Sequence, residues 1–111
     1  MTAREELLEK LRTKVRAPVE RHADAVLDAF VDDNEGLATF QLARADLDAL
    51  ITRLEADELS GLAHQLALHE SDLSAGIREM SESLRTSKTL THAAETFATV
   101  VGLLARIVAL A

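Results

Sequence analysis

The chain has no cysteine and only one proline, Pro18, in 111 residues. The absence of cysteine excludes disulfide bonds and every metal site that depends on thiolate ligands. Glycine is scarce too, since the chain has only four, at positions 36, 61, 76 and 102. Proline and glycine are the residues that most often interrupt regular structure, so their scarcity favours long helices over short strands and tight turns.

Aromatic residues are also few: the chain has Phe30, Phe40 and Phe97 but no Tyr or Trp. Apolar residues nevertheless make up 48 % of the chain, which is ordinary for a globular protein and too high for a disordered one. The core must therefore consist mainly of Leu, Ala, Val and Ile side chains. The length suits a single domain over residues 1–111.

Strongly basic segments and long apolar runs are missing as well. The formal net charge is -7, and a nucleic-acid partner would need positive charge opposite its phosphates, so we expect no nucleic acid. The first ten residues, MTAREELLEK, have no apolar run of the kind found in signal peptides. The most apolar stretch, 97–111, is shorter than the roughly 20 residues of a spanning helix. We therefore expect a cytoplasmic protein and no membrane role. If the protein does bind a membrane, residues 97–111 are the segment that would do so.

Apolar residues recur at steps of three and four through almost the whole chain, as in amphipathic helices. Thr2 and Glu5 have the spacing of a capping box, so the first helix should begin there. The segment Asp32–Gly36 should end it, because Asn and Gly accept the left-handed conformation that closes many helices. The apolar periodicity keeps its phase across Pro18, which predicts one helix with a kink at Pro18.

Two further helices show the same periodicity. The second should cover about 37–56, and the third has its apolar residues between Leu59 and Leu84. Nothing between Leu54 and Leu59 forbids a helix. A single helix over 37–85 is therefore an alternative, although it would be too long for a compact monomer.

A fourth helix should follow the hydroxyl-rich segment 81–91, with Ser87 or Thr89 as its cap. From Val100 onward this helix is apolar on nearly every side. The fold predicted is all-α, an up-down bundle of about four helices.

The last helix holds more apolar residues than one buried stripe needs. The stripe that can face the bundle's own core consists of Phe97, Val101, Leu104 and Val108. The apolar residues off this stripe are Val100, Leu103, Ile107 and Leu110. Since a helix that is apolar all round is enclosed by partners, we predict that these four contact a second chain or a packed neighbouring helix. The alternative is a central helix wrapped by its own bundle.

His22 and His69 each lie on the apolar side of a predicted helix. Two imidazoles in a helical interior could bind a metal or a small ligand. Two ligands leave a coordination set incomplete, however, and the Glu-x-x-His pairs of carboxylate-bridged di-metal bundles are missing. We therefore keep His22 and His69 as the only metal candidates and expect no cofactor.

The sequence has no recognisable catalytic motif. Ser60-Gly61 and Ser74-Ala75-Gly76 lack the strand–turn–helix setting of a nucleophile elbow, and no glycine-rich phosphate loop occurs. The sequence favours a non-enzymatic structural or protein-interaction bundle that forms homo-oligomers through apolar helix faces. The alternative is a bundle that binds a small ligand or metal through His22 and His69.

Overall fold

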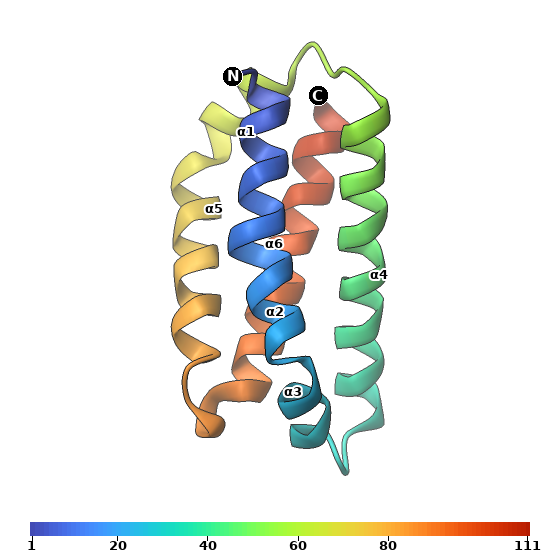
Figure 1. Ribbon diagram of the computed structural model, residues 1–111, viewed down its shortest axis with the longest axis vertical. Helices are drawn as coiled ribbons and strands as arrows, with labels where there is room; N and C mark the ends of the chain where they lie inside the picture. Colours follow the sequence, from blue (N-terminus) through green and yellow to red (C-terminus); the bar gives the residue numbers. More distant parts are fainter.

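The computed structural model describes all 111 residues as helices joined by short connections, without a strand (Figure 1). The first helical arm consists of α1 (Ala3–Lys10), the π-helical segment η1 (Leu11–Arg16), α2 (Ala17–Arg21) and α3 (Ala23–Ala29). It is followed by α4 (Asn34–Ala56), α5 (Leu62–Ser83), the 3₁₀ turn η2 (Ser87–Thr89) and α6 (Leu90–Leu110). The predicted all-α fold is confirmed. The run α1–η1–α2 is one continuous helix and α3 is a second one, so the chain has five helices rather than four.

The division of the first arm falls at His22, four residues beyond Pro18. The chain stays helical through Pro18, as predicted, and leaves the helical conformation at His22, whose φ and ψ are -104° and 6°. A proline ring collides with the carbonyl group four residues earlier and has no N–H to donate. The wider turns of η1 end at Arg16, two residues before Pro18, and accommodate its ring. The prediction of one continuous first helix with a kink at Pro18 is therefore corrected to two helical segments that meet at His22.

Local side chains fix the starts of two helices. Thr2 Oγ1 accepts a hydrogen bond from the Glu5 amide at 3.2 Å, as the capping-box spacing predicts. Asp33 caps α4, because its Oδ1 accepts from the Gly36 amide at 2.8 Å. Asn34 and Gly36 therefore open α4 instead of closing the first arm, and no residue of the chain has a positive φ.

Between α4 and α5 the chain leaves the helical path, which excludes the alternative of one helix over 37–85. The connection crosses one end of the bundle, from α4 on one side to α5 on the other (Figure 1). Gly61 lies at the end of this crossing, where its amide donates to the Ala111 carbonyl at 3.1 Å. A Cβ at Gly61 would lie 2.7 Å from that carbonyl oxygen, so this approach requires glycine.

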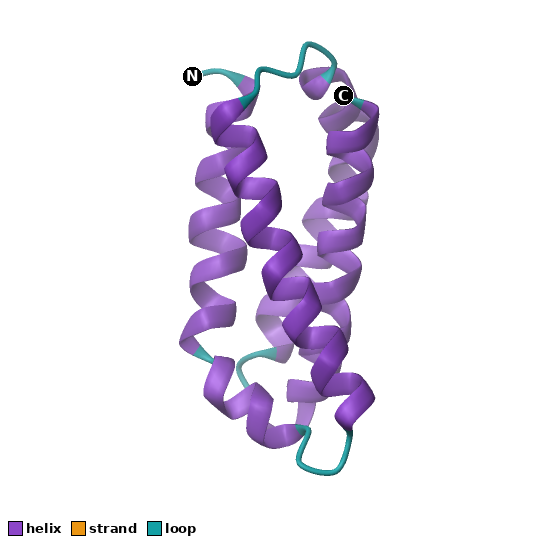
Figure 2. Cartoon of the chain, turned by 90° about the vertical axis from the view of Figure 1, so that its right-hand side faces the viewer, coloured by secondary structure: helices purple, strands orange, loops and turns teal.

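In the bundle, α4 and α5 lie on opposite sides, with the first arm and α6 between them (Figure 1). Helix α6 packs against α5, α4 and α3, while α1 packs against α4 and α5. Successive helices alternate in direction, so α6 runs parallel to α4 and antiparallel to α5. Loops occur at the connections between helices and at the N-terminal end of the chain (Figure 2).

Three ion pairs join the first arm to α4 in antiparallel register. They are Arg12–Glu55 at 2.7 Å, Arg16–Asp48 at 3.7 Å, and Glu20–Arg44, in which Arg44 Nε donates at 2.9 Å. The hydrogen bonds to Glu20 raise the pKa of Arg44 above its usual value, against the lowering effect of desolvation. All six side chains are partly exposed, so these pairs set the register more than they stabilise the fold.

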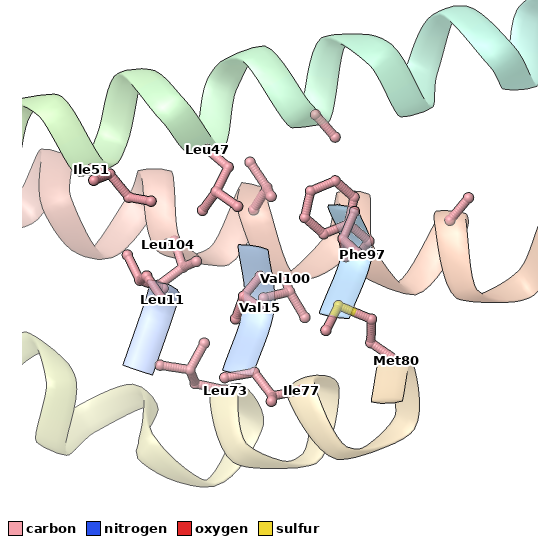
Figure 3. Close-up of a cluster of buried hydrophobic side chains, with 14 of the residues drawn as sticks. Leu11, Val15, Leu47, Ile51, Leu73, Ile77, Met80, Phe97, Val100 and Leu104 are labelled. Carbon is pink, nitrogen blue, oxygen red and sulfur yellow. The ribbon is translucent and has the colours of Figure 1, made fainter. Parts of the chain in front are cut away.

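One continuous core runs along the bundle and contains 26 buried apolar residues. Figure 3 labels ten of them, from all four sides: Leu11, Val15, Leu47, Ile51, Leu73, Ile77, Met80, Phe97, Val100 and Leu104. Phe40 and Phe97 meet edge to face with 5.9 Å between ring centroids, which joins α4 to α6. The core is thus aliphatic with one aromatic contact, as the composition predicts.

Candidate functional site

The structure places His22 and His69 far apart along the bundle. Leu7 of α1 and Glu70 of α5 line one surface hollow, so His69 lies at about the level of Leu7. His22 is fifteen residues beyond Leu7, or about 22 Å along the bundle at 1.5 Å per residue. Both imidazoles are half-buried, and His69 Nδ1 lies 2.9 Å from the Gln65 carbonyl oxygen. At this separation they cannot bind one metal ion or one small ligand together.

Other metal-ligating side chains do not gather into a site. No group of three or more His, Asp or Glu side chains has the arrangement needed to hold a metal ion. His92 lies on the surface of α6, with Nε2 2.8 Å from Glu79 of α5 and Nδ1 3.9 Å from Glu95. The contact with Glu79 joins α6 to α5, and the contact with Glu95 lies within α6.

The four residues predicted to form an interface have different environments on α6. Val100 and Ile107 are 1 % and 0 % exposed, while Leu103 is half-buried and Leu110 is 60 % exposed. Val100 and Ile107 are covered by the chain's own helices and are not available to a second chain. The physical reason is that α6 packs against three helices, so its buried side is wider than one stripe. Leu103 and Leu110 remain as interface candidates.

One side of α6 is left uncovered, and we call it the outer face of α6. Its exposed residues are Glu95, Thr99, Gly102, Ala105, Arg106, Ala109 and Leu110. They recur mostly at steps of three and four, so they share one side of the helix. Only Glu95 and Arg106 carry a charge, and the residues between them are small. The middle of the outer face therefore consists of small uncharged residues, between one acidic and one basic residue.

Gly102 lies in the middle of the outer face and differs from the other glycines. A Cβ added at Gly76 would lie 2.9 Å from a methyl carbon of Val100, and at Gly36 and Gly61 it would meet atoms at 2.6 and 2.7 Å. A Cβ at Gly102 would have no atom within 4 Å. Glycine inside a helix costs about 1 kcal/mol relative to alanine. Nothing within the chain offsets that cost at Gly102.

A shallow hollow of about 160 Å³ extends the outer face onto α4. Its lining consists of Thr39, Leu42, Ala43, Asp46, Ala98, Val101, Gly102 and Ala105. Leu42 is 62 % exposed and lies beside Gly102 in this lining. The hollow therefore adds an exposed leucine to one flank of the outer face.

Leu68 of α5 provides an exposed leucine on the other flank, with 63 % of its surface accessible. Glu79, eleven residues later, lies 2.8 Å from His92 of α6. Eleven residues are about three helical turns, so Leu68 and Glu79 share the side of α5 that borders α6. The outer face is thus flanked by an exposed leucine on each neighbouring helix.

Sequence reasoning did not select Leu42, Leu68 or Gly102. A signal for the two leucines exists, because both fall off the apolar lines of their helices and so belong to an exposed side. Gly102 has no such signal. The sequence does not reveal that Gly76 faces a packed side chain while Gly102 faces open space.

By length and composition, Ser87–Leu110 is suited to cross a membrane, because a stretch of 18 residues within it has a mean hydropathy of 1.7. This candidate span is longer than the 97–111 stretch considered from the sequence. Half of its most apolar part is buried inside the bundle, however, and a buried core helix meets the same criterion. This property therefore does not distinguish a membrane helix from a core helix.

No protein-family model, no curated protein and no solved structure matches this chain. Function is therefore inferred from the surface, packing and charges of the chain itself.

Proposed function

We propose that this protein is a non-enzymatic interaction module that associates with a second copy of itself through the outer face of α6. The observation that carries the proposal is Gly102, which faces open space in the middle of that outer face. A helix without a side chain at one position lets another backbone approach closely, because the distance between packed helices depends on the contacting side chains. Contact with a partner would offset the cost of glycine at this position.

Exposed apolar side chains around Gly102 support self-association. Leu42, Leu68 and Leu110 are each at least 60 % exposed. Large apolar patches on soluble proteins commonly mark interaction sites. The chain has a net charge of -7, and the outer face carries one charge of each sign. A second acidic copy would therefore meet little repulsion there.

One surface hollow has no catalytic pair of side chains, which agrees with a non-enzymatic role. The hollow beside Phe30 and Phe40 contains three carboxylates, from Asp33, Glu35 and Glu95. The one hydroxyl in its lining, Thr39 Oγ1, donates to the Glu35 backbone carbonyl at 3.0 Å. No nucleophile is therefore paired with a base there, which is the arrangement that covalent catalysis requires.

The substitution Gly102→Leu tests the proposal, because a leucine has room in the single chain but would hold a second helix away. Light scattering should give wild-type protein twice the 12.1 kDa of one chain and the variant the mass of one chain. Circular dichroism should show the same helix content for both. The matched control Ala25→Leu, at an exposed position of α3, should remain dimeric. Dimeric Gly102→Leu protein would contradict the proposal.

A further inference from the structure

We infer that two copies pair through the outer faces of α6 in an antiparallel, two-fold arrangement, with Glu95 of each copy facing Arg106 of the other. This inference rests on the proposed self-association and adds the geometry and the charge contacts of the interface. It identifies the partner surface as the same surface on a second copy, which is the commonest form of oligomer contact.

Two pairs of outer-face residues are symmetric about the midpoint between Val100 and Val101. Glu95 and Arg106 lie equally far from this midpoint, one on each side, and so do Thr99 and Gly102. In a two-fold interface, a residue on one copy faces the residue of the second copy that lies equally far from the axis on its other side. An antiparallel pair of α6 helices centred on this midpoint therefore brings Glu95 opposite Arg106 and Thr99 opposite Gly102.

The two charges favour this direction of pairing. Apart from His92, Glu95 and Arg106 are the only acidic and basic residues of α6. Within the chain Arg106 forms no ion pair, and Glu95 has only the 3.9 Å contact with His92. In a parallel pair each charge would face its like, whereas in the antiparallel pair each faces its opposite. Like charges brought together across an interface are strongly unfavourable, so the antiparallel direction is selected.

The shapes of the residues near the midpoint also fit. Thr99 projects from the helix, and Gly102 leaves open space where Thr99 of the second copy would fit. Leu42 lies beside Gly102, close to the level of the axis. A half turn about the axis therefore brings Leu42 near its own counterpart and removes both leucines from water. Each leucine buried in this way stabilises the pair.

The available area is sufficient for a stable dimer. The bundle measures 43 × 22 × 19 Å, and α6 runs along its longest dimension. A specific interface takes about 800 Å² of surface from each partner, which a face of these dimensions can supply. A membrane surface fits less well, because helices that lie on membranes usually carry several Lys and Arg residues, and the outer face carries only Arg106.

Charge exchange tests the pairing. Glu95→Arg alone and Arg106→Glu alone each place like charges at both ion pairs, so each variant should dimerise at least about tenfold more weakly. The double variant restores opposite charges and should dimerise like the wild type. An equimolar mixture of the two single variants should form heterodimers. The control Arg78→Glu, which makes the same charge change on α5, should dimerise normally.

Spin labels test the direction independently. The chain has no cysteine, so Thr91→Cys gives one labelling position, near the start of α6. Thr91 lies between nine and ten residues from the midpoint, which places the two labels about 28 Å apart along an antiparallel pair. A parallel pair would bring them side by side. Electron paramagnetic resonance on the dimer should therefore give the long distance.

The possible outcomes separate this inference from the proposed function. Two results would overturn the antiparallel pairing and leave the proposed self-association intact. One is a dimer whose affinity is unchanged by the charge substitutions, and the other is a dimer whose two spin labels lie side by side. A wild-type chain that is monomeric at high micromolar concentration would overturn both. Monomeric protein that sediments with phosphatidylcholine–phosphatidylserine vesicles would also overturn both and would assign the outer face to a membrane.

Discussion

Gly76 and Gly102 are both interior residues of helices, but a methyl group added to each meets different surroundings. At Gly76 it would lie 2.9 Å from a methyl carbon of Val100, which is 1 % exposed. At Gly102 it would lie in open space. Since alanine favours the helix by about 1 kcal/mol over glycine, packing decides whether that gain is realised.

Replacing these two glycines with alanine should therefore have unequal effects. Gly102→Ala should raise the free energy of unfolding of the monomer by about 0.5–1 kcal/mol. Gly76→Ala should raise it less, or lower it, because the stiff and buried Val100 must shift. Urea unfolding of dilute protein measures both. Equal stabilisation would contradict the packing described around Gly76.

The sequence predicts which residues are buried where a helix packs through only one of its sides. Val15, Val19 and Val26 follow the apolar line of the first arm, and all three are at most 1 % exposed. The sequence predicts that Val100 and Ile107, which lie off the apolar line of α6, contact a second chain or a neighbouring helix. The structure buries both against neighbouring helices. Their burial depends on how many helices surround α6, and the sequence of α6 does not contain that information.

At the scale of elements, the first arm shows how a helix accommodates a proline. The ring of Pro18 would collide with the carbonyl of Lys14, four residues earlier. In the wider turns of η1 the Ala17 amide donates to the Arg12 carbonyl, five residues back. The apolar periodicity predicted a continuous helix here. It did not predict η1, because six residues are too few for the periodicity to distinguish π-helical from α-helical turns.

Helix α6 has one side in the core and one in solvent. Replacing a leucine with alanine should therefore lower the free energy of unfolding on the core side and have little effect on the solvent side. Leu104 is fully buried, so Leu104→Ala should lower the free energy of unfolding by about 2–5 kcal/mol. Leu110 is 60 % exposed, so Leu110→Ala should change it by less than about 0.5 kcal/mol in the monomer. The second variant should nevertheless weaken self-association. Urea unfolding and light scattering separate the two effects, and a large loss of monomer stability in Leu110→Ala would contradict the position given to that side chain.

At the scale of the whole molecule, the crossing between α4 and α5 determines which surface is left uncovered. These consecutive helices lie on opposite sides of the bundle, and α6 lies between them (Figure 1). The outer face of α6 is therefore bordered by α4 on one flank and by α5 on the other. The apolar pattern predicted an all-α fold, but with four helices instead of five and with too narrow a buried side for α6. It could not predict which helices are neighbours, because each buried side fits more than one arrangement of the bundle.

Sedimentation equilibrium of the wild-type chain tests self-association through the outer face most directly. At high micromolar concentration and physiological salt, we expect a mass of twice the 12.1 kDa of one chain, decreasing toward one chain on dilution. Hydrogen exchange in the same samples should slow in α6 around Gly102 as the dimer forms. A mass of one chain at every concentration, with unchanged exchange in α6, would contradict the account.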